Sequence, residues 1–302
     1  MSLLNLTNDG LPNVLVVLYA AVARSRSTMS RDELLESVSP AGVVDDDGKM
    51  ARQTLNRWTE LGLFRDDGSA ISLAQPPSRE WRDEREFLAS VRSAARRCAL
   101  SEANNGDLWA HENAKAADLT RSLAWLLAQD VYRTTFSSLE DLELKQIADP
   151  EARLMRNDTR RNGLQVWGHF LGFVHQPGGG DIDPTTAVRE VLNDCIQPGE
   201  DMPAVTLIER LAESLPVLDG GGWRRAVEAR LSSQALPTMA EGQLSTSLSR
   251  ALIGLLLEEE LRFENRADVG SSIVFTGRDG LRSDYRYSWV RRAKPILGGK
   301  GR

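Results

Sequence analysis

Residues 49–57 hold five long polar side chains whose types are those that contact DNA. An arginine can bind guanine, and an asparagine or glutamine can bind adenine, through paired hydrogen bonds in the major groove, while lysine commonly contacts phosphate. The five residues are Lys49, Arg52, Gln53, Asn56 and Arg57. If one outward face of a helix presents them, this segment is a candidate DNA-binding surface.

The apolar residues of the same segment predict that helix. Ala51, Leu55 and Trp58 recur at steps of three and four, which is the spacing of one buried stripe, and the polar residues, Arg57 among them, are expected to lie off it. Gly62 is expected to end the helix, and the Arg-Asp-Asp-Gly sequence at residues 65–68 predicts a hairpin turn. A polar-faced helix followed by a tight hairpin is typical of the recognition helix and wing of a winged helix-turn-helix.

A second copy of the segment lies 109 positions further on, at residues 160–173. Four residue types are identical in this alignment: Arg52 and Arg161, Leu55 and Leu164, Trp58 and Trp167, Phe64 and Phe173. The same alignment places Asn56 on Gln165 and Leu61 on Phe170. We interpret the two copies as an internal repeat of a three-helix unit, over residues 11–73 and about 119–182.

The context upstream of the two copies is also similar. Ser30 and Glu33, three residues apart and followed by two leucines, predict a capping box at the start of a short helix. Ser138 and Asp141 occupy the equivalent place before the second copy. Both copies are therefore expected to begin their second helix in the same way.

The two copies differ in charge. Asp45, Asp46 and Asp47 precede the first helix, where carboxylates suit the helix dipole but repel a phosphate backbone. The second copy has four arginines against one aspartate, namely Arg153, Arg156, Arg160 and Arg161 against Asp158. The second copy, including Gln165, is therefore expected to be the better DNA-binding candidate.

Residues 184–302 are less regular. A long helix is expected at residues 245–261, followed by a hairpin of residues 262–264 with residues 273–275. Helix followed by hairpin is again the order of a recognition helix and wing, so a third winged helix is possible, although no residue-level repeat supports it.

The C-terminal end combines aromatic and basic residues. Tyr285, Tyr287 and Trp289 alternate with polar residues as in a strand, and basic residues surround them: Arg286, Arg291, Arg292, Lys294, Lys300 and Arg302. Such a strand can stack bases while it neutralises phosphate. The alternative is an edge strand whose aromatic side chains pack on the third domain.

Length and composition bound the class of protein. With 302 residues, 41% of them hydrophobic and 26% charged, the chain is long enough for two or three ordinary globular domains. A net charge of −6 argues against nonspecific wrapping of nucleic acid, but it does not exclude a local basic face. Two cysteines are too few for a disulfide framework, no apolar run has membrane-spanning length, and no signal peptide is apparent, so a cytoplasmic location is expected.

Motifs that would indicate catalysis are missing from the sequence. His111, His169 and His175 are far apart and lack neighbours at metal-ligand spacing. The glycines at residues 178–180 are not followed by the Lys-Ser/Thr pair of a phosphate-binding loop, and no Gly-x-Ser-x-Gly motif occurs. We therefore expect no cofactor or metal and no enzymatic activity, with a DNA-processing enzyme as a low-weight alternative.

The N-terminal end resembles a known family. The residues at positions 1–5 (MSLLN) and 9–12 (DGLP), together with Trp58, Leu63 and Phe64, are similar to the protein G family of the bacterial Dpd clusters. Those clusters insert 7-deazaguanine derivatives into DNA and restrict unmodified DNA. The resemblance covers mainly the first ~75 residues; it implies a cytoplasmic, non-catalytic member of a multiprotein modification–restriction system for antiviral defence, and it transfers no functional residues.

These observations predict a mainly α protein with small β-hairpins, in which tandem winged-helix units are joined by helices. The expected ranges are a winged-helix domain at residues 1–76, a linker helix with a second unit at 77–183, and a C-terminal helical domain with a hairpin at 184–302. The expected partners are double-stranded DNA and other proteins of a defence complex, with no membrane contact. The alternative function is a protein–protein scaffold that uses its winged helices as docking surfaces.

Overall fold

The chain is mainly helical, with short antiparallel strands, in a computed structural model. The structure describes residues 3–4, 11–25, 28–40, 42–43, 46–77, 80–109, 115–155, 157–175, 180–232, 234–267 and 270–294. It divides into two compact units: unit 1 contains Met1–Thr120 with Leu154–Leu171, and unit 2 contains Arg121–Arg153 with Gly172–Arg302. This division passes through the predicted middle range of residues 77–183 and does not follow the order of the sequence.

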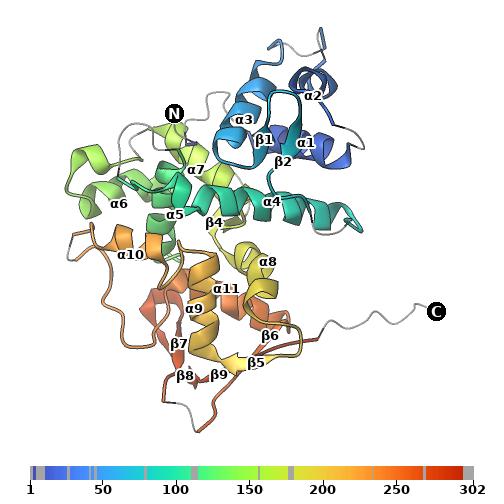
Figure 1. Cartoon of the computed structure of the whole chain (residues 1–302). Coiled ribbons are helices and arrows are strands. Elements are labelled where there is room, and N and C mark those ends of the chain that lie inside the picture. The colour runs from blue at the N-terminus through green and yellow to red at the C-terminus, as the bar shows by residue number, and fades with distance from the viewer. Residues whose placement is uncertain are drawn as a thin grey trace. The chain divides into compact units, whose positions relative to one another are not determined.

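The N-terminal part of unit 1 is a group of helices with one hairpin, visible at the blue end of the chain in Figure 1. Its elements are α1 (Pro12–Arg24), α2 (Arg31–Val38), α3 (Lys49–Glu60), β1 (Phe64–Asp66), β2 (Ile71–Leu73) and α4 (Glu84–Leu100). Leu15 and Leu18 of α1 are fully buried, as are Leu55 and Trp58 of α3, which confirms the predicted stripe. Burial of these side chains fixes which face of α3 points outward.

The hairpin of this part has a third, minimal strand beside it. Strands β1 and β2 pair antiparallel, with Phe64 opposite Leu73, and Ile71 donates its N–H to the carbonyl of Met29 at 2.9 Å. The order across the small sheet is therefore Met29, β2, β1, with the last strand in the middle. The residue that precedes α2 thus pairs with the strand that ends the hairpin.

The ends of α2 and α3 form as the sequence predicts. Ser30 accepts a hydrogen bond from the N–H of Glu33, and the Glu33 carboxylate accepts one from the N–H of Ser30, which completes the capping box. Helix α3 ends where Gly62 adopts a φ of +82°, and the next N–H, that of Leu63, returns to the carbonyl of Trp58 at 2.8 Å. A left-handed residue at this place turns the chain directly into β1.

The middle of the chain repeats the same order of helices and hairpin. Its elements are α5 (Ala117–Ala128), α6 (Leu139–Gln146), α7 (Asp158–Phe170), β3 (Val174–His175) and β4 (Asp181–Ile182). The start of α6 differs from the prediction, because Ser138 makes no capping hydrogen bond to it. Ser138 instead belongs to a short 3₁₀ turn, Phe136–Ser138, and bonds to Thr135. The second predicted capping box is therefore wrong.

The two tryptophans of the repeat are both buried in unit 1, as predicted, and they contact each other. Trp58 is 0% exposed and Trp167 is 1% exposed, and their ring centroids lie 5.4 Å apart at an interplanar angle of 47°. After the tryptophans, however, the alignment shifts by one residue. Helix α7 is one residue longer than α3, so its left-handed exit falls at Gly172 and β3 begins at Val174.

Two of the predicted equivalences are therefore wrong. Since β1 begins at Phe64 and β3 at Val174, Phe64 corresponds to Val174 rather than to Phe173. Leu61 and Leu171 are the capping residues that precede the two left-handed glycines, so Leu61 corresponds to Leu171 rather than to Phe170. The extra residue of α7 between tryptophan and exit accounts for both errors.

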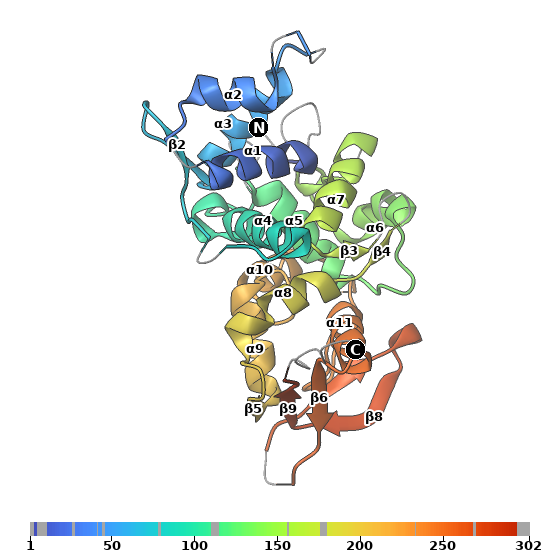
Figure 2. The same cartoon turned by 90° about the vertical axis from the view of Figure 1, so that its right-hand side faces the viewer.

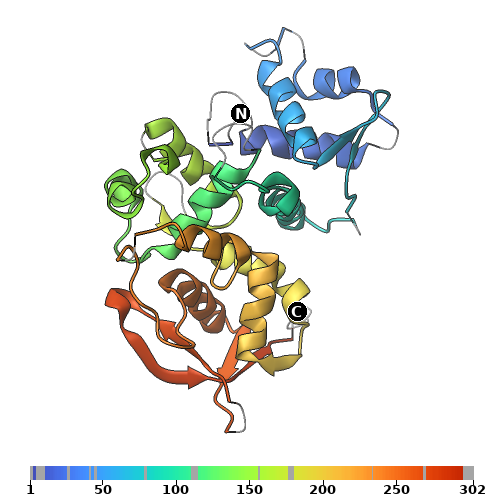
Figure 3. The same cartoon turned by 60° about the vertical axis from the view of Figure 1, so that its left-hand side comes forward.

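The last part of the chain lies within unit 2 and contains the three-stranded sheet. Figures 2 and 3 show its helices on one side of the strands. The elements are α8 (Thr185–Cys195), β5 (Asp201–Pro203), α9 (Ala204–Ser214), α10 (Gly222–Glu228), α11 (Thr246–Leu257), β6 (Leu261–Glu264), β7 (Ile273–Thr276), β8 (Arg282–Tyr287) and β9 (Trp289–Arg292).

The pairing of these strands differs from the prediction. The expected hairpin of residues 262–264 with residues 273–275 does not form, because β6 pairs with β9 and β7 pairs with β8. Strand β9 also pairs with β5, so the sheet order is β5–β9–β6 with the last strand again in the middle. The β7–β8 hairpin is thus an insertion between the two strands that follow α11.

The exit of α11 matches that of α3, although its sequence does not. Glu259 adopts a φ of +59°, and the N–H of Glu260 returns to the carbonyl of Leu255 at 2.9 Å before β6 begins. Leu255 thus takes the place that Trp58 has in α3, and Glu259 takes the place of Gly62. Because the residue types at both places differ from those in α3, the sequence shows no residue-level repeat at this third helix exit.

Candidate nucleic-acid interface

The outward face of α3 carries three of the predicted DNA-contacting residues. Lys49, Arg52 and Asn56 are exposed, opposite the side on which Leu55 and Trp58 are buried. The spacing of three and four residues places them along one line of the helix. Among the described residues, neither Lys49 nor Arg52 has a carboxylate partner, so both charges are available to a ligand.

Two other predicted residues of α3 are less accessible. Gln53 is half-buried, and its Oε1 is buried without a hydrogen-bond partner among the described residues. Arg57 is 5% exposed and its Nη1 donates to Glu60 at 3.1 Å, so the prediction that it faces outward is wrong. Arg57 lies one helical turn from the buried Thr54 and Leu61, which places it at the edge of the buried stripe.

Arg31 joins the three parts of this surface. Its guanidinium donates to the side-chain oxygen of Asn56 and to the carboxylate of Asp66 at 2.9 Å, so it connects the start of α2, the middle of α3 and strand β1. The carbonyl oxygen of Asn56 is thereby occupied, and its NH₂ group stays available as a donor. Arg65 is exposed beside Asp66 on the hairpin and adds a further cation.

Carboxylates lie at both ends of this face. Asp46 accepts hydrogen bonds from the N–H groups of Gly48 at 3.1 Å and Met50 at 2.7 Å, where it caps α3. At the hairpin, Ser69 and the N–H of Ala70 donate to Asp67, and these bonds, chiefly that from Ser69, hold the pKa of Asp67 below its ordinary value. The expected role of aspartates at this helix start holds for Asp46, while Asp45 lies outside the described residues.

The equivalent face of α7 is less exposed than its sequence suggests. Arg160, Arg161 and Gln165 are all half-buried, and Arg161 pairs with Asp158 one turn earlier in the helix. Arg156 lies outside the described residues. The higher arginine count of the second copy therefore does not translate into more exposed charge on α7.

The chain's N-terminal segment also covers part of α7. A Cβ atom added at Gly163 would lie 2.3 Å from the carbonyl oxygen of Leu4, so only glycine lets the backbone approach this closely. Leu3 and Leu4 are buried, and the N–H of Leu4 donates to Asp118 at 3.4 Å. One side of α7 is therefore part of the core of unit 1.

Helix α11, at the equivalent position in the last part of the chain, has almost no polar outward face. Its residues Thr246, Ser247, Leu248, Ser249, Ala251, Leu252 and Leu255 are all buried. Arg250 is its one cation, and it pairs with Asp181 at 3.1 Å and Asp183 at 3.2 Å. This helix is not available for insertion into a DNA groove.

The C-terminal basic residues divide between the two faces of the β5–β9–β6 sheet. Neighbouring residues of a strand point to opposite faces, so Arg291 and Arg292 cannot both face outward. Arg291 is exposed, whereas Arg292 is half-buried and donates to the carbonyl of Ile196 at 2.8 Å. Burial also lowers the pKa of Arg292. The prediction that Arg292 is a ligand-facing residue is therefore not supported by its position.

The aromatic residues of the C-terminal strands are largely covered. Tyr287 packs against Phe263 and Phe275, with ring centroids 5.6 Å and 5.0 Å away. The guanidinium of Arg266 lies 4.3 Å above the ring of Trp289. Tyr285 is 72% exposed. The aromatic packing agrees with the alternative interpretation, but the expected strand is divided: Tyr285 and Tyr287 lie on β8, which pairs with β7 in a two-stranded sheet, whereas Trp289 lies on β9, the central strand of its sheet.

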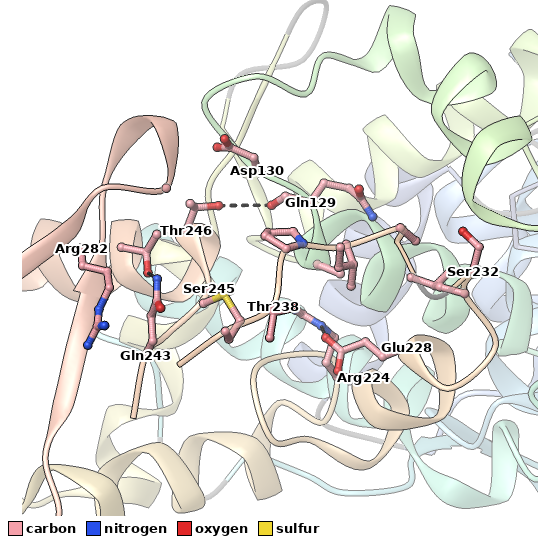
Figure 4. A pocket seen from close by; sticks show the side chains of 18 residues that line it. Gln129, Asp130, Arg224, Glu228, Ser232, Thr238, Gln243, Ser245, Thr246 and Arg282 are labelled. Atoms are coloured by element: carbon pink, nitrogen blue, oxygen red, sulfur yellow. Dashed lines mark hydrogen bonds and ion pairs between the residues drawn. The ribbon is translucent and has the colours of Figure 1, made fainter. Parts of the chain in front are cut away.

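A cavity of about 640 Å³ lies in unit 2, between the end of α5, helix α10 and the start of α11 (Figure 4). Its polar side chains bond both to one another and to neighbouring backbone: Arg224 donates to Glu228 at 2.5 Å, and Thr246 donates to the backbone carbonyl of Gln129 at 3.2 Å. The residues that line it include no histidine or cysteine.

The described histidines are exposed, whereas the cysteines are half-buried or buried. His169 and His175 are exposed, His111 lies outside the described residues, and within the described part of the chain no three metal-ligand residues cluster. Burial raises the pKa of Cys98 to about 11 and also raises that of Cys195, so both thiols stay protonated at neutral pH. No helix in the described part of the chain has the length and apolar character to cross a bilayer.

Fold and surface together define a mainly helical protein with small hairpins, in which helix α3 exposes Lys49 and Arg52. The model of the DpdG-like family matches residues 1–269, and the chain belongs to that family. Comparison with curated proteins and with solved structures gives no match. The resemblance predicted from the N-terminal residues is thus confirmed, and it extends through most of the chain.

Proposed function

We propose that this chain is a non-catalytic, DNA-engaging member of a Dpd-type 7-deazaguanine modification–restriction system, with three tandem winged-helix units. The family places the chain in the context of Dpd-type systems. The observation that carries the DNA-binding part is the outward face of α3, where Lys49 and Arg52 are exposed and without a carboxylate partner among the described residues. Arg31 holds Asn56 on that face beside the hairpin.

The winged-helix assignment rests on topology. In such a domain, a short strand precedes the second helix, and the last strand lies between it and the strand that follows the third helix. Residues 12–73 have this order, with Met29 as the short strand, and residues 185–292 have it with β5, β9 and β6. The middle copy has the three helices and the hairpin. Left-handed residues at Gly62, Gly172 and Glu259 mark the three equivalent helix exits.

On duplex DNA, α3 would lie in the major groove with the β1–β2 hairpin against the backbone. Arg52 is placed to contact a base edge and Lys49 to contact phosphate, because both project from the exposed line of the helix. The carboxylates of Asp46 and Asp67 at the two ends of the face would limit nonspecific attachment. Affinity would then depend on the correct placement of a few cations.

The test is a titration of the full-length protein against duplex DNA at fixed low salt. The double variant K49E/R52E should bind much more weakly than the wild type. The double variant R85E/K145E changes the net charge equally at two exposed positions outside this face, and it should bind nearly as well. Equal losses in both variants would show that overall charge, rather than α3, governs the binding.

The second candidate function is a protein–protein scaffold, which exposed apolar side chains favour. Leu257 is 77% exposed at the end of α11, and Leu281 is 69% exposed beside the β7–β8 hairpin. An apolar interface of this kind binds with little dependence on salt, whereas DNA binding weakens steeply as salt rises. Tight, salt-insensitive binding to another protein of the system, with no DNA binding at low salt, would favour the scaffold.

A further inference from the structure

The outer face of the β5–β9–β6 sheet carries a pair of like charges that the fold does not require. We define the outer sheet face by Asp201, Arg262, Glu264, Arg266, Trp289 and Arg291. Arg262 and Arg291 lie directly opposite each other on neighbouring strands, and both are exposed. Like charges in this position destabilise a sheet. An anion bound between them would remove the repulsion.

The carboxylates of this face do not neutralise it. Asp201 accepts from Arg266 at 2.8 Å and lies 3.5 Å from Arg291, and Glu264 pairs with Arg266 at 3.0 Å. Both carboxylates are therefore directed mainly to Arg266. Arg262 has no carboxylate partner among the described residues, and its charge faces solvent.

The wider segment is also basic, in contrast to the chain as a whole. Residues 261–294 hold eight arginines and lysines against four aspartates and glutamates, whereas the whole chain has a net charge of −6. The sheet's own stability comes from the opposite face, where Met202 and Val290 are buried. The exposed arginines are thus not needed for the core.

The same face excludes recognition through base stacking. Of the residues that define it, only Trp289 is aromatic, and its ring is covered by the guanidinium of Arg266. The buried α11 excludes insertion of the third helix into a groove. What the surface offers is a row of guanidinium groups, which suits the phosphates of a nucleic-acid backbone.

We infer that the outer sheet face binds the phosphate backbone of duplex DNA through Arg262 and Arg291, without reading base sequence. This inference rests on the proposed DNA-engaging function and adds a second contact to that of α3. The last winged-helix unit would then hold DNA by its sheet, while the first reads it by its helix.

The experiment is a series of titrations with short duplexes of unrelated sequences across a range of salt concentrations. The variant R262E/R291E should bind every duplex more weakly by the same factor. Its plot of log affinity against log salt should be shallower by about 2, since each phosphate contact contributes a slope of about −0.9. The variant R262Q/R291Q, which removes the charge but keeps a polar side chain, should show the same change in slope. The control R85E/K145E should keep the slope of the wild type.

Four outcomes would overturn the inference. If R262E/R291E keeps the wild-type slope while K49E/R52E still weakens binding, the outer sheet face is not a DNA contact and the proposed function stands. If the loss depends on the duplex sequence, the face reads bases. If R85E/K145E flattens the slope equally, the effect is one of overall charge. If the wild type binds no duplex at low salt, the proposed function fails together with the inference. Thermal melting of each variant checks folding, and the glutamine variant serves if the glutamate variant is unstable.

Discussion

Helices α3 and α7 occupy equivalent places in two copies of one sequence pattern, yet they present different surfaces. In α3, Lys49 and Arg52 are exposed although aspartates precede the helix. In α7, which is richer in arginine, Arg160 and Arg161 are half-buried and the backbone of Leu4 covers Gly163. The number of charges in a segment therefore does not determine the charge that it shows to a ligand. Packing against the rest of the fold decides that.

Helix α11 extends the comparison to a third case. It has the same exit geometry as α3, but its side chains are almost entirely apolar or small, and it is buried on most sides. The three helices thus form a series from exposed through partly covered to buried. We expect that α3 contacts a ligand directly, and that the parts of the chain around α7 and α11 contact it through other surfaces.

The contact between the two repeat tryptophans should give the largest effect on stability. Trp58→Ala and Trp167→Ala should each lower the free energy of unfolding by about 3–5 kcal/mol, the range for removal of a large buried aromatic side chain. Because the rings lie 5.4 Å apart, the double variant should lose less than the sum by about 0.5–1.5 kcal/mol. Urea denaturation measures all three, with the half-buried Trp289→Ala as a control of smaller cost. A near-neutral result at either position would show that the two helices are not equivalent in the core.

The coverage of α7 can be tested at the glycine that permits it. Gly163→Ala should lower stability by about 1–3 kcal/mol, because the new methyl group would overlap the Leu4 carbonyl. Gly222→Ala in α10 is the matched control, since its Cβ would meet nothing within 4 Å, and it should change stability by less than about 1 kcal/mol. Thermal denaturation compares the two. Equal melting temperatures would mean that the N-terminal segment does not pack closely on α7.

The comparison also predicts which helix matters for DNA. Arg52→Glu should weaken duplex binding by about 1–3 kcal/mol, the value of one specific arginine contact, while Arg161→Glu should have a smaller effect. The reason is exposure, since Arg161 is half-buried and paired with Asp158. This reverses the expectation from the arginine count. A larger loss from Arg161→Glu, in a protein that still folds, would restore the ranking based on sequence charge.

Much of the helical architecture could be predicted from periodicity, because local patterns determine it. The stripe of Leu55 and Trp58, the capping box of Ser30 and the stop at Gly62 all depend on residues close in sequence. Strand pairing depends on distant residues, and β6 pairs with β9 across the inserted β7–β8 hairpin, which no local pattern indicates. The third helix exit was hidden because Glu259 adopts the conformation that glycine usually takes.

The candidate site was predictable in residue type but only partly in orientation. Arg52 and Asn56 lie well off the apolar stripe, so their exposure followed from spacing alone. Arg57 lies at the edge of the stripe, where the spacing of apolar residues does not determine whether a side chain is buried, and the structure buries it. Arg262 was missed because its role depends on the strand register that places it opposite Arg291. Alternation along β9 was the one sequence signal that could have separated Arg291 from Arg292.

Substitutions at the starts of α2 and α6 should have small effects on stability, and they test how far the two copies are alike. Ser30→Ala should cost about 1 kcal/mol, the usual value of a lost helix N-cap. Ser138→Ala should cost less, because Ser138 bonds within a three-residue turn and does not cap α6. Urea denaturation at neutral pH compares the two variants. Equal costs would mean that the second capping box forms after all.

The capping box also predicts a dependence on pH. Hydrogen bonds from Ser30, chiefly from its backbone N–H, hold the pKa of Glu33 below its ordinary value of 4.5. The ionised carboxylate therefore stabilises the folded state above pH 4.5, and this contribution is lost as the pH falls through the lowered pKa. Glu33→Gln should accordingly be less stable than the wild type at neutral pH, and the difference should shrink in acid. A difference that stays constant down to the acid transition would show that the carboxylate of Glu33 does not act as a charged cap. In that case the start of α2 would be no more strongly capped than the start of α6.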